Sequence, residues 1–583
     1  MEEEMNELQI KRAREARAAI ERLYIEMRHL FNRGRYRQLG EAGEVLTDAL
    51  LTVSPEIYGA MSDPYKVELD GLVYVLDRLP KGIEETRLIK LISSEGYEDS
   101  GFEVIMPAKR RRNCYRIDQE QMFIEVTRGR SEIYDILTHL TFMYIEARKI
   151  REHVQIRDAK TIVEWKKLGA MVEEGVRELP LEEEELALTY LSNILGRTFE
   201  ETRHAYRRLE QNKSTNNGLF HAIYWMGKLA MEDELEGKER VISFSPTLRE
   251  RIGQHLYGER WANAIKQYLH QKKLFDRPLH IISANMHSVM NSLYAYPALT
   301  KTLGKALDVE ALANELSLAE HGALRKKVRK YALTHGMHEQ QDPFGTNISV
   351  QIFDTARLNP KLLAPDLEVD SAFIQEEKPL ILVMDYAFGE QAYETMDELL
   401  RPYTVGDEIF PMNVKSINIM GKAGILEGGK GDIMIPDAHV FEGTADNYPF
   451  KNDFCCNDFE GEGVFVCSGP MITVLGTSLQ NRDLLAYFKY SSWSGIGLEM
   501  EGAHYQKAIQ AAYAIRKHIE SEIALRYAYY ASDNPLITGG TLASGSLGSV
   551  GVKPTYLITK KILGRILNPI HSTGELSPAP ALV

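Results

Sequence analysis

Apolar positions in the first third of the chain recur at the spacing of an α-helix. Over residues 8–30 they are separated by Arg, Lys and Glu, and residues 130–153 repeat the pattern. Thr198 and Glu201 have the spacing of a capping box, in which each side chain satisfies a backbone group at a helix start. We therefore expect residues 1–235 to form a large, mainly helical N-terminal region.

The pattern becomes mixed after residue 235. Pro278 leads into the apolar run LHIIS at 279–283, which suits a buried strand, and helical spacing returns over residues 308–333. We interpret residues 236–370 as a mixed α/β or helical region.

From residue 371 to the end, apolar runs typical of strands alternate with helical segments. The expected strands lie in EEKPLILVMDY, VKSINIMG, GVFVCSG and EIALRYAYYASD. The expected helices are GEQAYETMDELL, MEGAHYQKAIQAAYAIRKHI and PTYLITKKILGRIL. Because such alternation is typical of a sheet covered by helices on both faces, residues 371–583 are predicted to be an α/β domain.

Length and composition narrow the class of protein. A chain of 583 residues is too long for one hydrophobic core, so two or three domains are expected. A net charge of −14 argues against nucleic-acid binding, which needs a basic surface. The four cysteines lack the spacing of a zinc site, the charged N-terminus is unlike a signal peptide, and no apolar run is long enough to span a bilayer. We expect a cytoplasmic protein with reduced thiols and neither nucleic-acid nor membrane partners.

Three polar segments directly follow or adjoin the predicted strands of the C-terminal domain. They are GKAGILEGGKGD at 421–432, GLEMEGA at 497–503 and YASDNPL at 530–536. In open α/β sheets, ligands bind beyond the carboxyl ends of the strands, so these segments are the candidate site.

In this order, the three motifs resemble the purine nucleoside phosphorylase and nucleosidase superfamily. The run Ser532-Asp533-Asn534-Pro535-Leu536 is most similar to the AMP nucleosidase family, whose members also carry an extra N-terminal domain. The resemblance covers about residues 375–575. It implies a nucleoside phosphorylase-like domain with a mixed sheet flanked by helices, a purine nucleoside or nucleotide as ligand, and a homo-oligomer.

Asp533 is the candidate general acid, with Ser532 beside it as a substrate-binding residue. Cleavage of an N-ribosidic bond builds negative charge on the leaving purine, which a carboxylic acid can protonate. The position of Asp533 after the apolar run 523–530 would raise its pKa by burial. The alternative is that Asp533 only caps a turn in the sequence Ser-Asp-Asn-Pro.

Glu501 is the candidate ribose ligand. The resemblance implies that its carboxylate accepts hydrogen bonds from the ribose 2′- and 3′-hydroxyls and that Met500 packs against the sugar. A carboxylate can accept two such donors and also favours positive charge developing on the ribose. The alternative is an acidic residue at a helix N-terminus, a role that we assign to Glu499.

The reaction type depends on the nucleophile. A phosphorylase needs an anion site, but residues 384–391 contain Asp385 and Glu390 and no arginine. By resemblance, Glu390 is where hydrolytic nucleosidases carry a water-activating glutamate, which favours hydrolysis. Lys422 and Gly424 in GKAG could instead meet a phosphate, either inorganic phosphate or a 5′-phosphate of the substrate.

The base would lie against Met471 and Ile472, in a segment that resembles the purine-contacting segment of related enzymes. Those enzymes often present an aromatic ring there, and plain core packing is the alternative for both Met471 and Ile472.

Three further segments offer weaker evidence of a functional site. The segment from His335 to Glu339 lacks a zinc motif and is interpreted as a loop. The cluster from Lys109 to Arg112 is interpreted as a solvated basic loop or a surface for an acidic partner, with binding of a nucleotide phosphate as the lesser alternative. Residues 545–551 are interpreted as a mobile cover over the site or a flexible connector. We expect no metal and no cofactor.

The predicted function is hydrolysis of a purine nucleotide, by resemblance AMP, to free base and ribose 5-phosphate. Two alternatives remain: a purine nucleoside phosphorylase that uses inorganic phosphate, and a nucleotide-sensing protein that has the fold without the chemistry.

Overall fold

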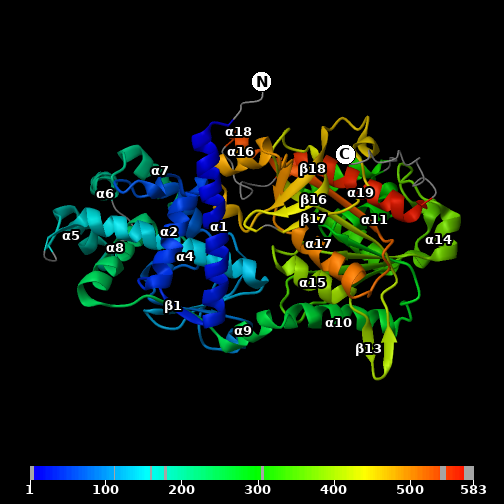
Figure 1. Cartoon of the computed structure of the whole chain (residues 1–583), viewed down its shortest axis with the longest axis horizontal. Coiled ribbons are helices and arrows are strands. Elements are labelled where there is room, and N and C mark those ends of the chain that lie inside the picture. The colour runs from blue at the N-terminus through cyan, green and yellow to red at the C-terminus, as the bar shows by residue number, and fades with distance from the viewer. Residues whose placement is uncertain are drawn as a thin grey trace. The chain divides into compact units, whose positions relative to one another are not determined.

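The computed structural model describes residues 5–110, 112–157, 160–175, 180–303, 307–444, 446–538 and 547–569. The chain divides into two compact units (Figure 1). One comprises Met1–Leu256 with the short segments Glu442–Thr444 and Leu475–Tyr487, and the other comprises the remaining residues from Tyr257 onward. In the part of the chain that is described, no helix has the length and apolar character needed to cross a membrane.

The first unit contains long helices, as expected from its periodicity. Helix α1 begins with a capping box between Asn6 and Gln9 and ends at Gly34, whose φ of 91° suits a glycine. The helices are α1 (Glu7–Arg33), α2 (Glu41–Val53), α3 (Leu69–Leu76), α4 (Gly129–Val154), α5 (Val163–Glu173), α6 (Leu181–Leu195), α7 (Phe199–Glu210), α8 (Leu219–Glu236) and α9 (Pro246–Gly253).

The first unit also contains a sheet that the hydrophobic pattern did not predict. Its strand order is β1-β8-β2-β5-β4-β3. The strands are β1 (Arg35–Arg37), β2 (Leu88–Ile92), β3 (Val104–Ile105), β4 (Cys114–Arg116), β5 (Gln121–Glu125) and β8 (Val241–Phe244), with a separate β6 (Gln155–Arg157) and β7 (Lys160–Thr161) pair. Runs of two to five residues are too short to show a clear strand period, so the expectation of a mainly helical region was incomplete.

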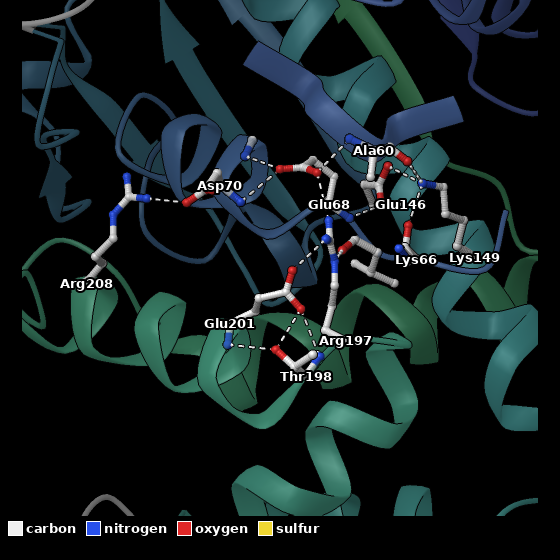
Figure 2. A network of polar contacts seen from close by, with 12 residues as sticks. Ala60, Lys66, Glu68, Asp70, Glu146, Lys149, Arg197, Thr198, Glu201 and Arg208 are labelled. Carbon is white, nitrogen blue, oxygen red and sulfur yellow. Dashed lines mark hydrogen bonds and ion pairs between the residues drawn. The ribbon is translucent and has the colours of Figure 1, made fainter. Parts of the chain in front are cut away.

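A buried carboxylate, Glu68, organises one corner of the first unit (Figure 2). Its oxygens accept hydrogen bonds from the backbone N–H groups of Ala60 at 2.8 Å, Asp70 at 3.1 Å and Gly71 at 3.2 Å. The guanidinium of Arg197 also donates to Glu68, at 2.9 Å. These donors satisfy the buried side-chain oxygens of Glu68, which caps the start of α3.

Glu146 on α4 extends the same network. It accepts the backbone N–H of Glu68 at 2.8 Å and pairs with Lys149 at 3.0 Å. Lys149 donates in turn to the carbonyls of Lys66 at 2.9 Å and Ala60 at 3.2 Å. The donors and acceptors in these contacts satisfy each other, so the network has a structural role.

The basic cluster that begins at Lys109 lies in a loop and Lys109 is exposed, but its two described arginines form ion pairs within the fold. Arg112 is buried and pairs with Glu132 at 3.1 Å, while Arg110 pairs with Asp135 at 3.1 Å. Both acids lie on α4, so these cations are neutralised within the fold; Arg111 lies outside the described residues.

The second unit is built on a mixed sheet, as expected. Its strand order is β10-β11-β12-β9-β15-β19-β18-β16-β17, and β20 pairs with both β15 and β16. The strands are β9 (Leu279–Ser283), β10 (Met337–Gln340), β11 (Val350–Asp354), β12 (Leu380–Met384), β15 (Val414–Ile425), β16 (Ile433–Phe441), β17 (Asn447–Pro449), β18 (Val466–Thr473), β19 (Gly497–Glu499) and β20 (Ala524–Asp533), with a separate hairpin of β13 (Tyr403–Val405) and β14 (Glu408–Phe410). The strands expected in the four apolar runs after residue 371 are therefore confirmed.

Helices cover both faces of this sheet (Figure 1). Side chains of α10, α15 and α17 pack on one face, and those of α11, α13 and α19 pack on the other. The helices from residue 256 onward are α10 (Leu256–Gln271), α11 (Ser288–Leu303), α12 (Val309–Ser317), α13 (Gly322–Thr334), α14 (Ser371–Glu377), α15 (Gln391–Leu400), α16 (Arg482–Tyr490), α17 (Gly502–Gln510), α18 (Pro535–Thr538) and α19 (Val552–Leu567).

The sheet begins earlier in the chain than the expected boundary at residue 371. Strand β9 lies between β12 and β15 and is parallel to both. Residues 279–283 thus belong to the same sheet as the C-terminal strands, and the second unit begins at Tyr257. The apolar run predicts the strand itself, but the strands with which it pairs lie about 100 and 135 residues further on, so the pairing does not follow from the local sequence.

Candidate active site

The carboxyl ends of several parallel strands meet at one edge of this sheet. Strand β9 is parallel to β12 and to β15, and β15 is parallel to β20. The residues that follow β9 and β12 and those that end β20 therefore gather at this edge, where ligands bind in open α/β sheets.

Gly424 on β15 links the two main motifs. Its backbone is aligned with Leu498 of β19 on one side and with Asp533 of β20 on the other. Neighbouring strands lie about 4.8 Å apart, so the backbones of Leu498 and Asp533 are about 10 Å apart across β15. Glu501 follows Leu498 by three residues, which brings the segments GLEMEGA and YASDNPL to the same part of the sheet.

Glu501 precedes the first residue of α17 and faces the segment after β12. Its Oε1 accepts the backbone N–H of Gly389 at 2.9 Å. Burial and, to a lesser extent, the charge of the neighbouring Glu499 raise the pKa of Glu501 to about 8, although the Gly389 hydrogen bond opposes the shift. Met500 beside it is buried. A ligand that donates hydrogen bonds to this carboxylate would favour its ionised form.

Glu499 has the structural role expected for it. Its Oε2 accepts the backbone N–H of Glu501 at 2.6 Å and that of Gly502, and the Thr473 hydroxyl donates to its other oxygen. Glu499 thus satisfies the free N–H groups at the start of α17. Gly502 is required here, because a Cβ would lie 2.2 Å from Cδ2 of the buried His439.

Asp533 ends β20 and is 3% exposed. The Ser532 hydroxyl lies 2.6 Å from its Oδ1 and 3.1 Å from the Ala423 carbonyl. Its Oδ2 is buried and has no hydrogen-bond partner among the residues that the structure describes. Burial raises the pKa of Asp533 above its ordinary value, although Ser532, Lys422 and Lys430 oppose the shift.

The turn after β20 is capped by Asn534 and not by Asp533. The Asn534 side chain accepts the N–H of Leu536 at 3.0 Å and donates to the Gly428 carbonyl at 3.0 Å. The turn-capping alternative for the Ser-Asp-Asn-Pro sequence is therefore satisfied by the asparagine. The Oδ2 atom of Asp533 has no such contact with a described residue.

Glu390 lies at the start of α15, next to the Gly389 amide that binds Glu501. It is partly exposed, and its charge raises the pKa of His504 on α17, although burial outweighs it and lowers that pKa to about 4. Glu390 therefore lies near the helix that begins after Glu501.

Met471 and Ile472 on β18 are both 0% exposed. Met471 packs in the core on the face that carries α15 and α17. Neither side chain presents accessible surface to a ligand in this structure, so their role against a base remains a prediction, and core packing is what the structure describes.

A cavity of about 660 Å³ opens beside Lys422. It is lined by residues that follow β9, by α11, α12, α13 and α19, and by Lys422 and Tyr530 from the sheet. Sequence reasoning missed Asn285, His287 and Arg325 in its lining. The first two could have been found, because the segment ANMHS at 284–288 directly follows the apolar strand LHIIS. In the segment 545–551, residues 545 and 546 lie outside the described residues, and Leu547, Gly548 and Gly551 line the cavity.

Of the histidines near residue 335, His335 lies in the turn after α13, as expected for a loop residue, but His338 lies in a strand. His338 lies in β10 and stacks on Tyr268 with ring centroids 3.8 Å apart, and His335 caps α13 and stacks on Tyr331. Within the described ranges, no group of three or more His, Cys, Asp or Glu side chains is placed to hold a metal ion.

Comparison with known proteins gives one family and several solved structures. The family described as "Family of unknown function (DUF6909)" matches residues 44–302 and 314–568. No curated protein matches the chain. A putative methylthioadenosine nucleosidase from Weissella paramesenteroides is 12% identical with a TM-score of 0.28, over 49% of this chain and 95% of that one.

Two further solved structures are similar to the same extent. A futalosine hydrolase mutant from Helicobacter pylori is 10% identical with a TM-score of 0.28, over 50% of this chain and 98% of that one. A purine nucleoside phosphorylase from Toxoplasma gondii in complex with immucillin-H is 14% identical with a TM-score of 0.27, over 50% of this chain and 92% of that one. At these values the neighbours carry no conclusion on function, which has to come from the residues of the chain itself.

Proposed function

The chain belongs to the DUF6909 family, whose function is unknown, and we propose that it hydrolyses the N-glycosidic bond of a purine nucleotide. The products are the free base and ribose 5-phosphate, and AMP is the substrate that the sequence resemblance implies. The observation that carries the proposal is the alignment of Gly424 with both Leu498 and Asp533, which puts the candidate ribose ligand and the candidate acid at one sheet edge.

Asp533 is the general acid. Its pKa is raised by burial, and its buried Oδ2 has no partner in the described part of the chain, so a proton held there can pass to the departing purine. The bond between the ribose C1′ and the base nitrogen breaks, the bonding electrons leave with the base, and the proton neutralises the developing negative charge.

Glu501 holds the sugar. The ribose 2′- and 3′-hydroxyls donate to its carboxylate, and these donors offset the burial that raises its pKa in the free protein. Once ionised, the carboxylate stabilises the positive charge that develops on the ribose as the bond breaks.

Glu390 completes the reaction by orienting water. Water adds through its oxygen to C1′, and its proton passes to the Glu390 carboxylate. The placement of Glu390 beside Gly389, which binds Glu501, supports this role.

The ammonium group of Lys422 is a candidate ligand for a phosphate on the substrate. It is exposed at the cavity, and no hydrogen bond or ion pair links its ammonium to another described residue. The same cation also favours the second candidate, a phosphorolytic reaction in which inorganic phosphate attacks C1′ in place of water.

The test is a product assay. The protein is incubated with purine nucleosides and nucleotides, with and without inorganic phosphate, and free base and sugar products are identified. Hydrolysis predicts base release without phosphate and ribose 5-phosphate as the sugar product. Strict dependence on phosphate, with ribose 1-phosphate or ribose 1,5-bisphosphate formed, would replace hydrolysis by phosphorolysis. Binding without release of base from any substrate would favour a nucleotide sensor.

A further inference from the structure

The cavity beside Lys422 has an unusual charge for this protein. The chain has a net charge of −14, yet the described residues that line the cavity include Lys422 and Arg325 and neither aspartate nor glutamate. The low-dielectric walls of a cavity strengthen the electrostatic field of the cations that line it, so this cavity attracts anions.

Neither cation forms an ion pair with a carboxylate in the described part of the chain. Lys422 has no ion pair within the described residues, and the guanidinium of Arg325 donates only to carbonyls, those of Leu316 at 2.8 Å, Leu318 at 2.6 Å and Ala319 at 3.1 Å. His287 adds a donor without a full charge, because desolvation lowers its pKa although Asp385 opposes the shift.

A buried donor supplements these cations. The Asn291 amide donates to the Tyr556 hydroxyl at 2.8 Å, and both side chains are buried in the cavity wall. The Tyr556 hydroxyl accepts in this bond, so its own proton is available to a ligand.

The rest of the wall is apolar. Met290 from α11, Ala313 and Leu316 from α12 and Val552 from α19 line it. A water molecule takes about 30 Å³ in the liquid, so a cavity of about 660 Å³ exceeds the needs of one phosphate and a few waters. Its volume lies in the range of sites for organic ligands.

We propose that this cavity binds the 5′ group of the substrate, and that this group carries an anion on an apolar stem and no cationic centre. The proposal rests on the proposed function, because Lys422 precedes Gly424 by two residues and Tyr530 precedes Asp533 by three, which puts the cavity beside the candidate reaction centre. No aspartate or glutamate is among the described residues that line the wall, so an ammonium group in the ligand would have no ion-pair partner there, which is costly. The preferred substrates are therefore purine nucleosides whose 5′ group is longer than that of AMP and ends in an anion, and AMP is a weaker substrate.

The probes are three adenosines with 5′ thioether chains of equal length that end in a carboxylate, a methyl group or an ammonium group. AMP, inorganic phosphate and hexanoate complete the set. Base release gives kcat/KM for each nucleoside, and calorimetry gives the dissociation constant for every probe with the full-length protein. We expect the carboxylate probe to surpass its neutral and cationic counterparts and AMP in both measurements.

Substitutions distinguish the effect of a cation that lines the cavity from the effect of a cation that only lies near Asp533. Lys422→Met should reduce the preference for the carboxylate probe over the methyl probe by about 10- to 100-fold, the effect of one charge-assisted hydrogen bond. Lys422→Glu should reverse the preference in favour of the ammonium probe. Lys430→Met is the matched control, because Lys430 also acts on Asp533 but does not line the cavity, and it should leave the preference unchanged.

Each failure has its own meaning. The proposal is refuted if the carboxylate, methyl and ammonium probes bind with equal affinity or if AMP is the best ligand. It is also refuted if Lys430→Met reduces the preference for the carboxylate probe as much as Lys422→Met does. Hexanoate or inorganic phosphate binding as tightly as the carboxylate nucleoside would show a separate anion site and refute the assignment to the 5′ group. If no probe releases base but calorimetry shows the expected preference, the hydrolase proposal fails while the ligand class of the cavity stands.

Discussion

Replacing Asp533 by asparagine tests the role of the buried carboxyl at the end of β20. Asparagine has nearly the same shape, and the Ser532 hydroxyl can still donate to its side-chain oxygen at the 2.6 Å position. The amide nitrogen would take the place of Oδ2, which has no partner in the described residues, so the cost in unfolding free energy should not exceed about 1–3 kcal/mol.

The effect on turnover should be much larger. An amide cannot transfer a proton to the leaving base, and positioned general acids contribute about 10²- to 10⁴-fold. This range corresponds to about 3–5 kcal/mol of transition-state free energy. The assay is base release at saturating substrate, with thermal unfolding measured on the same samples. Turnover close to wild type in a folded D533N protein would refute the assignment.

Ser532→Ala is the matched control. It keeps the carboxyl but removes the hydrogen bond that lowers the pKa of Asp533. The pKa should rise, so the acid stays protonated to higher pH and the alkaline limb of the kcat profile should move upward. An unchanged or downward-shifted limb would show that Asp533 is not the group titrating there.

Three further substitutions test the remaining roles. Glu501→Gln should lower nucleotide turnover and leave adenine affinity largely unchanged, and an equal loss of both would contradict the ribose assignment. The same variant should flatten the pH dependence of stability, because a carboxyl whose pKa is raised from 4.5 to about 8 binds a proton in the folded protein that the unfolded chain has released, so wild-type stability falls as pH rises between these values. Glu390→Ala should abolish base release in phosphate-free buffer with little change in substrate affinity by calorimetry; retained hydrolysis would exclude Glu390 as the water ligand. Gly502→Ala would place a methyl group 2.2 Å from Cδ2 of His439, so it should displace the start of α17 and lower the melting temperature, and a wild-type melting curve with full activity would show that the segment adapts.

Local patterns in the sequence determined much of the second unit. The apolar runs at 380–384, 414–425 and 524–533 form strands, because a continuous apolar run of strand length suits a sheet buried on both faces. The motif residues Glu501 and Asp533 could also be singled out, since Asp533 ends a predicted strand and Glu501 opens a predicted helix. Helix starts such as that at Thr198 follow from side-chain capping, which acts within one turn.

Only the tertiary structure decided which segments meet. The place of β9 between β12 and β15 depends on strand pairs far apart in sequence, and the short strands of the first unit are stabilised by their neighbours more than by their own composition. The cavity likewise joins Lys422 to Arg325 and Tyr556, about 100 and 130 residues away along the chain. The raised pKa of Asp533 and the close approach of Gly502 to His439 also arise from packing. Burial, charge proximity and strand pairing depend on distances in space, and the sequence specifies them only through the whole fold.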